Sequence, residues 1–402
     1  MKVLYIYIEN YLCNQDMIAA LEHYEKNGIK TRVVKFPFSP PGQWHDAELE
    51  NRLEKAIEKE TPDFVFSFNY FPVVSNACER KGIRYVSWLY DNPQVSVYSC
   101  SLIHPCNSVF LFDHSIYEEF ASQGFRNVFF LPMAAPVRRL DAMHPTLSQK
   151  ERFGAAVSFV GSLYTEEHNF YDRMIQKLDP YTVGYLEGVM RAQMQVQGAS
   201  FVRDCLTDDL IRRMQEALPL YPHADGVETP GYLFTDYVLN RKITAMDRME
   251  ILRDIGAGRR RLVDHPVMKV FTRDPEYACD GFQNMGTVDP YAEAPYVYKS
   301  TKINLNITLR SIRSGIPLRC FDIMGAGGFL LSNYQEDFLY FFKPDKDFVF
   351  YESRDDLMNK IALYLRDEEL RMRIAESGYR KVASEHTFDI RVRQILDVIK
   401  EG

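Results

Sequence analysis

One stretch of the sequence, residues 301–332, contains the side chains best suited to binding an anion. It reads TKINLNITLRSIRSGIPLRCFDIMGAGGFLLS, which predicts a buried strand, a basic loop, a short helix opening at Pro317 and a second apolar strand. Arg319 lies in the first turn of that helix, where free backbone N–H groups and the helix dipole also attract negative charge. Asp322 lies on nearly the same helix face and can accept hydrogen bonds from a ribose diol. A phosphate-binding group beside a diol-binding group predicts a nucleoside diphosphate site.

The charge pattern around this stretch supports the same prediction. No Asp or Glu occurs from Ala294 to Phe321, although the chain has 55 acidic residues among 402. The same interval contains the basic residues Lys299, Lys302, Arg310, Arg313 and Arg319. The alternative interpretation is that these are solvated loop charges, with Asp322 as an ion-pair partner. The strand, loop and helix context favours an anion site.

Composition limits the class of protein. A chain of 402 residues with 46% hydrophobic and 13% aromatic residues predicts two or more well-filled domains. The net charge of −7 argues against a nucleic-acid partner or an anionic lipid surface. Seven scattered cysteines without a CxxC pair indicate free thiols in a reducing compartment. The opening MKVLYIYIENYL is too short and too strand-like for a signal peptide, and no run predicts a membrane span, so we expect a cytoplasmic protein.

Two α/β units are predicted along the chain. Residues 1–135 alternate between helical stripes and the apolar runs KVLYIYI, TRVVKF, DFVFSF, RYVSWLY, SVFLF and NVFFLP, a pattern typical of a parallel sheet covered on both faces. Residues 136–155 are polar and predict a linker. A second unit over 156–386 is interrupted by a helical insertion at about 167–258. Two such units are expected to face each other across a cleft, and ligands bind at the carboxyl ends of parallel strands.

Several blocks of sequence resemble a known family. The C-terminal blocks GIPLRCFDIMGAGGFLLSN, FVFYESRDDLMNKIALYL and EHTFDIRV resemble the C-terminal domain of GT-B glycosyltransferases of the group that includes the spore maturation protein CgeB. The N-terminal blocks PDFVFSFNYFP, RYVSWLYDNP and VFLFDHSIYEEFASQGF are similar to the domain found with it. The resemblance implies two Rossmann-like domains, with residues 387–402 forming a helix that crosses back to the first domain.

The resemblance also implies roles for particular residues. Arg319 is expected to face the donor diphosphate and Asp322 the donor ribose, while Gly161 and Ser162 lie opposite the phosphates and residues 286–289 lie beside the base. An ordinary strand-end turn is the alternative for Gly161. The rest of the expected donor-binding segment consists of Arg313, Ser314, Gly315, Ile316, Pro317 and Leu318.

One departure from the family concerns the stereochemistry of transfer. Retaining relatives carry two glutamates with seven residues between them, and the corresponding positions here are Ser314 and Asp322. Because Ser314 cannot supply the charge of the first glutamate, a retaining or an inverting outcome both remain open.

A general base for an inverting transfer is expected in the first unit. Asp91 follows the strand RYVSWLY and is our first candidate, although Asp-Asn-Pro is also a turn sequence. Asn69 with Tyr70, and Asp113 with His114, follow two other strands. We expect Asp113 and His114, and also Asn14 and Asp16, to cap helices rather than to act in catalysis.

The anion site and the resemblance together imply a metal-independent glycosyltransferase without a cofactor, using a UDP- or dTDP-linked sugar as co-substrate. The acceptor is left as a glycan, a small molecule or a protein, and a homodimer is one alternative for the oligomeric state. The Asp345-Lys346-Asp347 triplet is interpreted as a surface turn rather than as a metal site. A non-catalytic GT-B partner subunit and a nucleotide-sugar epimerase are the alternative functions.

Overall fold

The computed structural model describes the chain except for residues 27–28, 40–43, 168, 263–265 and 402. The described residues form two compact units. Unit 1 contains Met1–Ala134, Pro222–Thr229 and His386–Gly402, and unit 2 contains Ala135–Tyr221 and Pro230–Glu385. Each unit is built on its own six-stranded sheet.

Unit 1 has a sheet in the order β4-β1-β5-β6-β7-β8, and every neighbouring pair is parallel. Its strands are β1 (Lys2–Ile8), β4 (Arg32–Phe38), β5 (Phe64–Phe68), β6 (Tyr85–Trp88), β7 (Asn107–Leu111) and β8 (Val128–Phe130). The strands β5, β6 and β7 are buried along their whole length, which explains their continuous apolar sequences. A small antiparallel pair, β2 (Glu25–Lys26) with β3 (Ile29–Lys30), lies outside this sheet.

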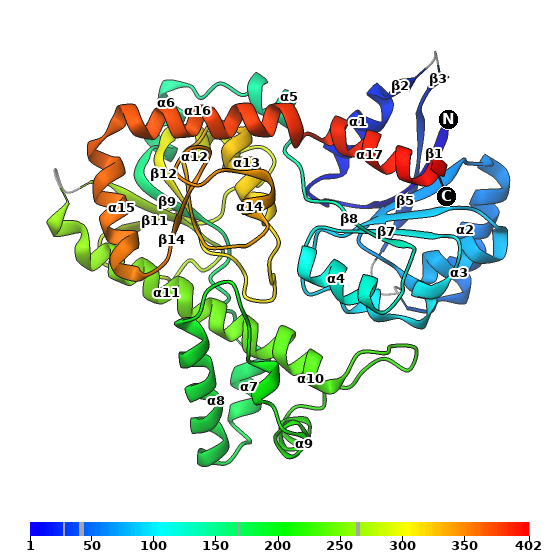
Figure 1. Cartoon of the computed structure of the whole chain (residues 1–402), viewed down its shortest axis with the longest axis horizontal. Coiled ribbons are helices and arrows are strands. Elements are labelled where there is room, and N and C mark those ends of the chain that lie inside the picture. The colour runs from blue at the N-terminus through cyan, green and yellow to red at the C-terminus, as the bar shows by residue number, and fades with distance from the viewer. Residues whose placement is uncertain (27–28, 40–43, 168, 263–265, 402) are drawn as a thin grey trace. The chain divides into compact units, whose positions relative to one another are not determined.

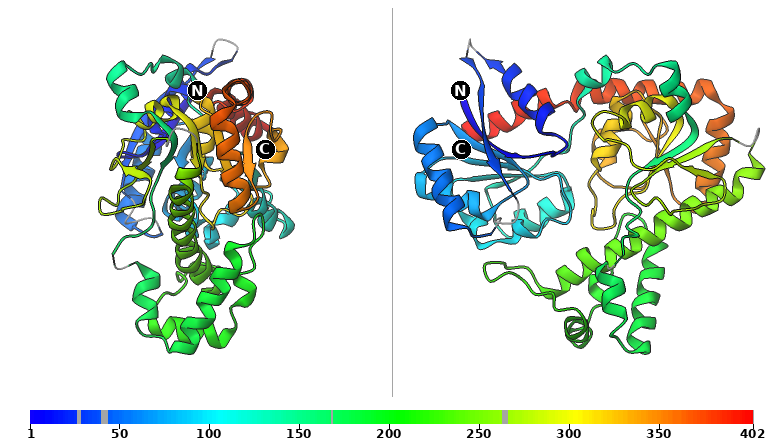
Figure 2. Two further views of the ribbon diagram at one scale, coloured as in Figure 1. Left: turned by 90° about the vertical axis from the view of Figure 1, so that its left-hand side faces the viewer. Right: turned by 180° about the vertical axis from the view of Figure 1, so that it is seen from behind.

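The helices of unit 1 include one from the far end of the chain. They are α1 (Asn14–His23), α2 (Ala47–Glu60), α3 (Pro72–Lys81), α4 (His114–Ser122) and α17 (Phe388–Glu401), with 3-10 turns η2 (Val95–Tyr98) and η3 (Cys100–Ile103). The C-terminal helix α17, red in Figure 2, lies beside α1 near the other end of the sequence. Helix α1 ends at His23, because Tyr24 has an extended backbone and strand β2 follows it.

Unit 2 repeats the parallel arrangement with the order β11-β10-β9-β12-β13-β14. Its strands are β9 (Ala155–Val160), β10 (Met268–Phe271), β11 (Phe282–Asn284), β12 (Thr301–Asn306), β13 (Leu330–Asn333) and β14 (Val349–Tyr351). Its helices outside the insertion are α5 (Val137–Ala142), α6 (Leu147–Phe153), α12 (Ala294–Ser300), α13 (Leu318–Gly325), α14 (Phe338–Phe341), α15 (Arg354–Arg366) and α16 (Glu368–Glu385). Edge strand β11 was not predicted, because FQN is short and only half-buried.

The insertion is a helical subdomain between β9 and β10. It contains α7 (Phe170–Ile175), α8 (Pro180–Met194), η4 (Arg203–Cys205), α9 (Asp208–Ala217), α10 (Pro230–Leu233), the π-helical turn η5 (Phe234–Leu239), α11 (Asn240–Gly258) and η6 (Arg259–Arg261). Its buried apolar side chains, among them Leu186, Met190 and Phe234, form a cluster of their own. Figure 1 shows α7, α8, α9 and α10 gathered at one end of the long helix α11.

Residues 136–155 were predicted to form a linker, and the structure differs from that expectation. This segment forms helices α5 and α6 and reaches into β9, and it belongs to unit 2. The side chain of Thr146 accepts a hydrogen bond from the Gln149 backbone, and the Gln149 side chain accepts one from the Thr146 backbone. This capping box begins α6, and the helix buries Phe153. Only a few apolar residues anchor these short helices, so their periodicity is weak in the sequence.

Candidate active site

The centre of the candidate site lies at the carboxyl ends of β9 and β12, two neighbouring strands of unit 2. Gly161 follows β9 and has φ +155. A Cβ built on Gly161 would lie only 2.5 Å from Nη2 of Arg319. The missing side chain therefore makes room for the Arg319 guanidinium, a local reason for glycine that the sequence alone did not indicate.

Arg319 is held in place by neutral groups. Its Nη1 donates to Oδ1 of Asn306, the last residue of β12, over 2.8 Å. Its guanidinium carbon lies 5.3 Å from the centre of the Phe159 ring. No carboxylate forms an ion pair with Arg319 in the described parts of the chain. The remaining N–H groups of this half-buried cation are suited to an anionic ligand.

The loop before α13 is fixed by the segment that follows β13. The carbonyl oxygen of Ser314 accepts from the Asp337 backbone at 3.0 Å, and that of Gly315 accepts from Nε2 of Gln335 at 3.1 Å. Ile316 is buried. Pro317 is the N-cap of α13, so the first helical residue is Leu318 and not Pro317 as predicted. The difference arises because Pro317 has an extended ψ of 150°.

Arg313 lies in the loop before α13, and Asp322 lies within α13. Both side chains are half-buried. Asp322 is on α13, one turn after Arg319, as the helix periodicity predicted. Burial raises the pKa of the Tyr298 hydroxyl, and the charge of Asp322 raises it further.

Arg310, one of the basic residues in the acid-free stretch, is not available to a ligand. Its Nε donates to Oδ2 of Asp247 at 2.6 Å, and its Nη1 donates to the carbonyl of Val196 at 2.8 Å. The acid that neutralises it comes from α11 in the insertion, far away in sequence. Counting charges along the chain therefore overestimated the positive charge of this loop.

Arg248 was missed by the sequence analysis. It is 2% exposed on α11 and donates through Nη1 to the Ser162 carbonyl at 2.5 Å and through Nη2 to the Ile307 carbonyl at 2.7 Å. These carbonyls belong to the loops that follow β9 and β12. An arginine inside a helix of mixed composition carries no sequence signal of this role. The Ser162 hydroxyl itself accepts from the Tyr164 backbone, which fixes a turn.

The loop expected beside the nucleotide base follows edge strand β11. Gly286 has φ +72, and its backbone N–H donates to the Asn284 side chain at 3.0 Å. The Asp289 side chain accepts from the backbone of Tyr291 at 2.9 Å and of Ala292. Gly286 is thus held by the end of β11, and the Asp289 carboxylate is occupied by the backbone of the residues that follow it.

In unit 1, three neighbouring strands bring a polar cluster together around Asp91. Asn69 follows β5, and its Oδ1 accepts from the backbone of Tyr90 and of Asp91, each at 3.0 Å. Its Nδ2 donates to Oδ2 of Asp91 at 2.6 Å and to the Tyr11 hydroxyl oxygen at 3.1 Å. Asn69 has φ +59, a conformation that asparagine tolerates. Asn69 therefore orients the Asp91 carboxylate, a role that the sequence suggested only by position.

The environment of Asp91 raises the pKa of its carboxyl group. Desolvation is the main cause, and the hydrogen bonds from Asn69 and Tyr11 partly oppose it. Asp91 nevertheless keeps an exposed surface, so we attribute the rise to protein crowding one side of the carboxylate. An accessible carboxylate with a raised pKa is suited to accept a proton from a hydroxyl group.

Other polar residues of unit 1 are structural. Asp113 caps α4 by accepting from the Ile116 backbone, which confirms the capping prediction. Asn14 was expected to cap α1, but the N-cap residue is Cys13. The Asn14 side chain instead accepts a hydrogen bond from the Tyr5 hydroxyl and donates one to the Ile8 carbonyl. Tyr70 is buried and bonded to Ser101.

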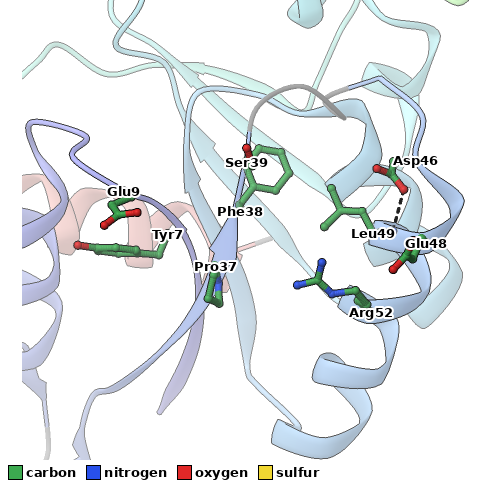
Figure 3. Close-up of a pocket in the computed structure, with 9 residues that line it drawn as sticks. All are labelled: Tyr7, Glu9, Pro37, Phe38, Ser39, Asp46, Glu48, Leu49 and Arg52. Carbon is green, nitrogen blue, oxygen red and sulfur yellow. Dashed lines mark hydrogen bonds between the residues drawn. The ribbon is translucent and has the colours of Figure 1, made fainter.

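A separate cavity of about 700 Å³ lies in unit 1 at the carboxyl ends of β1 and β4. Figure 3 shows Tyr7 and Glu9 on one wall and α2 on the other, with Arg52 directed toward the space between α2 and β4. It is lined by Tyr7, Glu9, Pro37, Phe38, Ser39, Asp46, Glu48, Leu49 and Arg52. Most of these residues are exposed, so the cavity is an open depression. Its mixture of rings, carboxylates and a guanidinium can contact a hydroxyl-bearing molecule.

The described residues contain neither a metal-binding cluster nor a membrane-spanning helix. Among the residues that the structure describes, no group of three or more His, Cys, Asp or Glu side chains is arranged to hold a metal ion. Asp347 accepts from the Lys343 backbone and from the Ser377 hydroxyl, as part of a turn. Within the described ranges, no helix has the length and apolar character needed to cross a membrane.

Comparisons with solved structures identify the fold. Anabaena HepE in complex with UDP-glucose superimposes with a TM-score of 0.56 at 9% identity, covering 100% of both chains. A glycosyltransferase from Rickettsia africae gives 0.53 at 9% identity, covering 100% of this chain and 98% of that one. This chain has the GT-B fold. A putative UDP-N-acetylglucosamine 2-epimerase from Listeria monocytogenes is also similar, with a TM-score of 0.50 at 10% identity over 99% of this chain and 95% of that one.

A family match locates the similarity in sequence. Residues 257–397 match a family model described as glycosyl transferase-like, and this segment includes α13 with Arg319 and Asp322. None of the functionally curated proteins matches the sequence. In this GT-B chain, the family match therefore covers the candidate anion site but not Gly161, Arg248 or Asp91.

Proposed function

We propose that this GT-B chain is a glycosyltransferase that moves a sugar from a UDP- or dTDP-linked donor to an acceptor, without a metal ion. In this proposal, unit 2 binds the donor. Gly161, Ser162, residues 313–318 and Arg319 surround the diphosphate, and Asp322 binds the ribose. The family match over residues 257–397 supports the transferase class. The similarity to the CgeB group stays a prediction.

One observation carries the proposal. The Arg319 guanidinium is bonded to an amide oxygen of Asn306 and lies at the carboxyl edge of a parallel sheet, in space left by Gly161. Half-buried cations are usually paired with a carboxylate, because desolvation of an unpaired charge is costly. A diphosphate supplies the missing negative charge, and the start of α13 adds backbone N–H groups beside it.

The first test is donor binding by wild type and Arg319→Ala. We expect UDP or dTDP to bind wild type and the substitution to weaken binding about tenfold or more, because charged hydrogen bonds to the diphosphate are lost. Isothermal titration calorimetry measures both affinities. Arg212→Ala is the matched control, because Arg212 is exposed on α9 and pairs with Asp209 there. Equal affinity in wild type and Arg319→Ala would overturn this assignment.

Asp91 is the proposed general base of an inverting transfer. This assignment rests on the hydrogen bond that orients its carboxylate toward Asn69, and the desolvation that raises the pKa of the carboxyl group supports it. The partner-subunit alternative predicts no turnover in any assay, and the epimerase alternative predicts conversion of the donor in the absence of acceptor. Product analysis with donor alone, and then with candidate glycan, small-molecule and protein acceptors, distinguishes the three functions.

A further inference from the structure

Two arginines from distant segments lie against the same ring near the end of β9, that of Phe159. The guanidinium carbon of Arg248 lies 5.3 Å from the centre of the Phe159 ring, the same distance as that of Arg319. Arg248 comes from α11, the last long helix of the insertion, whereas Arg319 comes from α13. The insertion therefore contributes a charge to the candidate donor site.

Arg248 also connects the two loops that form this site. Its Nε and Nη2 donate to the carbonyl of Ile307 at 3.2 and 2.7 Å, and its Nη1 donates to the carbonyl of Ser162 at 2.5 Å. Ser162 immediately follows Gly161, and Ile307 immediately follows Asn306, the partner of Arg319. One side chain thus fixes the spacing between the loops after β9 and β12.

The charge of Arg248 is not neutralised by a direct ion pair. No carboxylate lies within ion-pair distance of it in the described ranges, and its neighbour Asp247 is bonded to Arg310 at 2.6 Å. Burial, and next the charge of Arg319, lower the pKa of Arg248 to about 10, so it stays protonated at neutral pH. The buried Arg248 and the half-buried Arg319 repel each other without an anion between them, and a bound anion relieves that repulsion.

We propose that Arg248 is a positioning residue for the donor diphosphate, which fixes the loops at Ser162 and Ile307 and adds positive potential to that of Arg319. The inference rests on the proposed function, because it assumes that a diphosphate binds beside Arg319. It assigns the helical insertion a part in donor binding. Helix α11 connects the insertion to the loop after β12. The Thr244 hydroxyl accepts from the Arg310 backbone at 2.9 Å, and Asp247 pairs with the Arg310 side chain.

The experiment compares wild type with Arg248→Met and Arg248→Lys. Calorimetry measures the affinity for UDP, dTDP and inorganic pyrophosphate over a series of NaCl concentrations, and ligand-observed NMR measures the affinity for uridine. Arg248→Met is expected to weaken UDP and pyrophosphate binding about tenfold or more, to reduce the salt dependence, and to leave uridine affinity within about twofold. Arg248→Lys retains the charge and is expected to recover part of the loss.

The control is Arg253→Met on the same helix, because the Arg253 side chain is 67% exposed and its nearest acid is its neighbour Asp254. It is expected to bind UDP like wild type. If Arg248→Met does not fold, Arg248→Lys decides, since loss of the planar guanidinium still weakens pyrophosphate more than uridine.

The measurements distinguish a wrong role for Arg248 from a wrong donor site. Equal loss of UDP and uridine affinity, or wild-type affinity for UDP in both variants, overturns the role of Arg248 and leaves the proposed function standing. No binding of UDP, dTDP or pyrophosphate to the wild type overturns both the role of Arg248 and the donor site.

Discussion

The neighbours of Asp91 set both the orientation and the pKa of its carboxyl group. The Asn69 side chain fixes the turn that carries Asp91 and donates directly to its carboxylate. Desolvation raises the pKa of the carboxyl group, so the Asp91 carboxylate is a stronger base than that of an ordinary exposed aspartate. Both the location of Asp91 after β6 and the raised pKa of its carboxyl group therefore support the proposal that it is a general base.

The raised pKa of Asp91 predicts how activity depends on pH. Transfer requires the deprotonated carboxylate, so activity is expected to fall with decreasing pH at a value above the ordinary pKa of 3.8. Asp91→Asn is expected to lower kcat about 10²–10⁴-fold and to remove this acidic limb. The pH profile of kcat/KM for wild type, and kcat for the variant, check this.

Stability gives an independent readout for the same substitution. A carboxyl whose pKa is raised by folding contributes stability at low pH, and this contribution is lost as the pH rises through the folded-state pKa. At neutral pH Asp91→Asn is therefore expected to keep the wild-type Tm while activity falls. A fall in both, or full activity of the variant, would contradict the proposed role.

At the scale of elements, α6 shows why the segment before β9 is ordered. Its first turn has the Thr146 and Gln149 capping box, with backbone-to-side-chain distances of 3.3 and 2.9 Å. Its last carbonyls, of Glu151 and Arg152, accept from Nζ of Lys269 on β10 at 3.0 and 2.8 Å. Both ends of this short helix are therefore satisfied by side chains.

This arrangement predicts a measurable effect of the cap. Thr146→Ala is expected to lower the free energy of unfolding by about 1 kcal/mol, because one backbone N–H at the start of α6 loses its acceptor. Urea unfolding monitored by circular dichroism measures it. Ser148→Ala, an exposed change in the same helix, is the control. An unchanged urea midpoint in Thr146→Ala would indicate instead that the segment is a flexible linker.

At the scale of the whole molecule, the end of the chain completes the unit in which the chain begins. Phe388 of α17 is buried and lies 5.9 Å from the Trp88 ring, between ring centres. Arg391 donates to the carbonyls of Pro132 at 2.8 Å and Met133 at 3.1 Å. Burial lowers the pKa of Arg391 to about 10, so the guanidinium remains charged at neutral pH.

Removal of residues 386–402 is therefore expected to unfold unit 1. The deletion removes the buried side chains Phe388, Val392, Ile395 and Leu396. At about 1.5–3 kcal/mol each, their loss is comparable to the total stability of a domain. A red shift of Trp88 emission in a Trp44→Phe background would show the unfolding, with Phe388→Leu as a milder control. Native emission from the truncated chain would contradict this prediction.

The sequence was most informative about the elements. Continuous apolar runs predicted both parallel sheets, because burial of a strand on two faces is recorded in consecutive residues. The acid-free stretch and Pro317 indicated where α13 starts and made Arg319 the candidate for anion binding, since both signals are local in the sequence. The strand β11 and the helices α5 and α6 were not predicted, because too few apolar residues anchor them.

The sequence by itself determined the α/β class, the order of the strands along the chain and the candidate anion-binding segment, since each depends on neighbouring residues. Only the tertiary structure decided which charges come together: Arg310 is neutralised by Asp247, whereas Arg248 and Arg319 lie against the same Phe159 ring. It also placed Asn69 against Asp91. Contacts between side chains that are distant in sequence depend on how elements pack, and no local pattern of residue types records that packing.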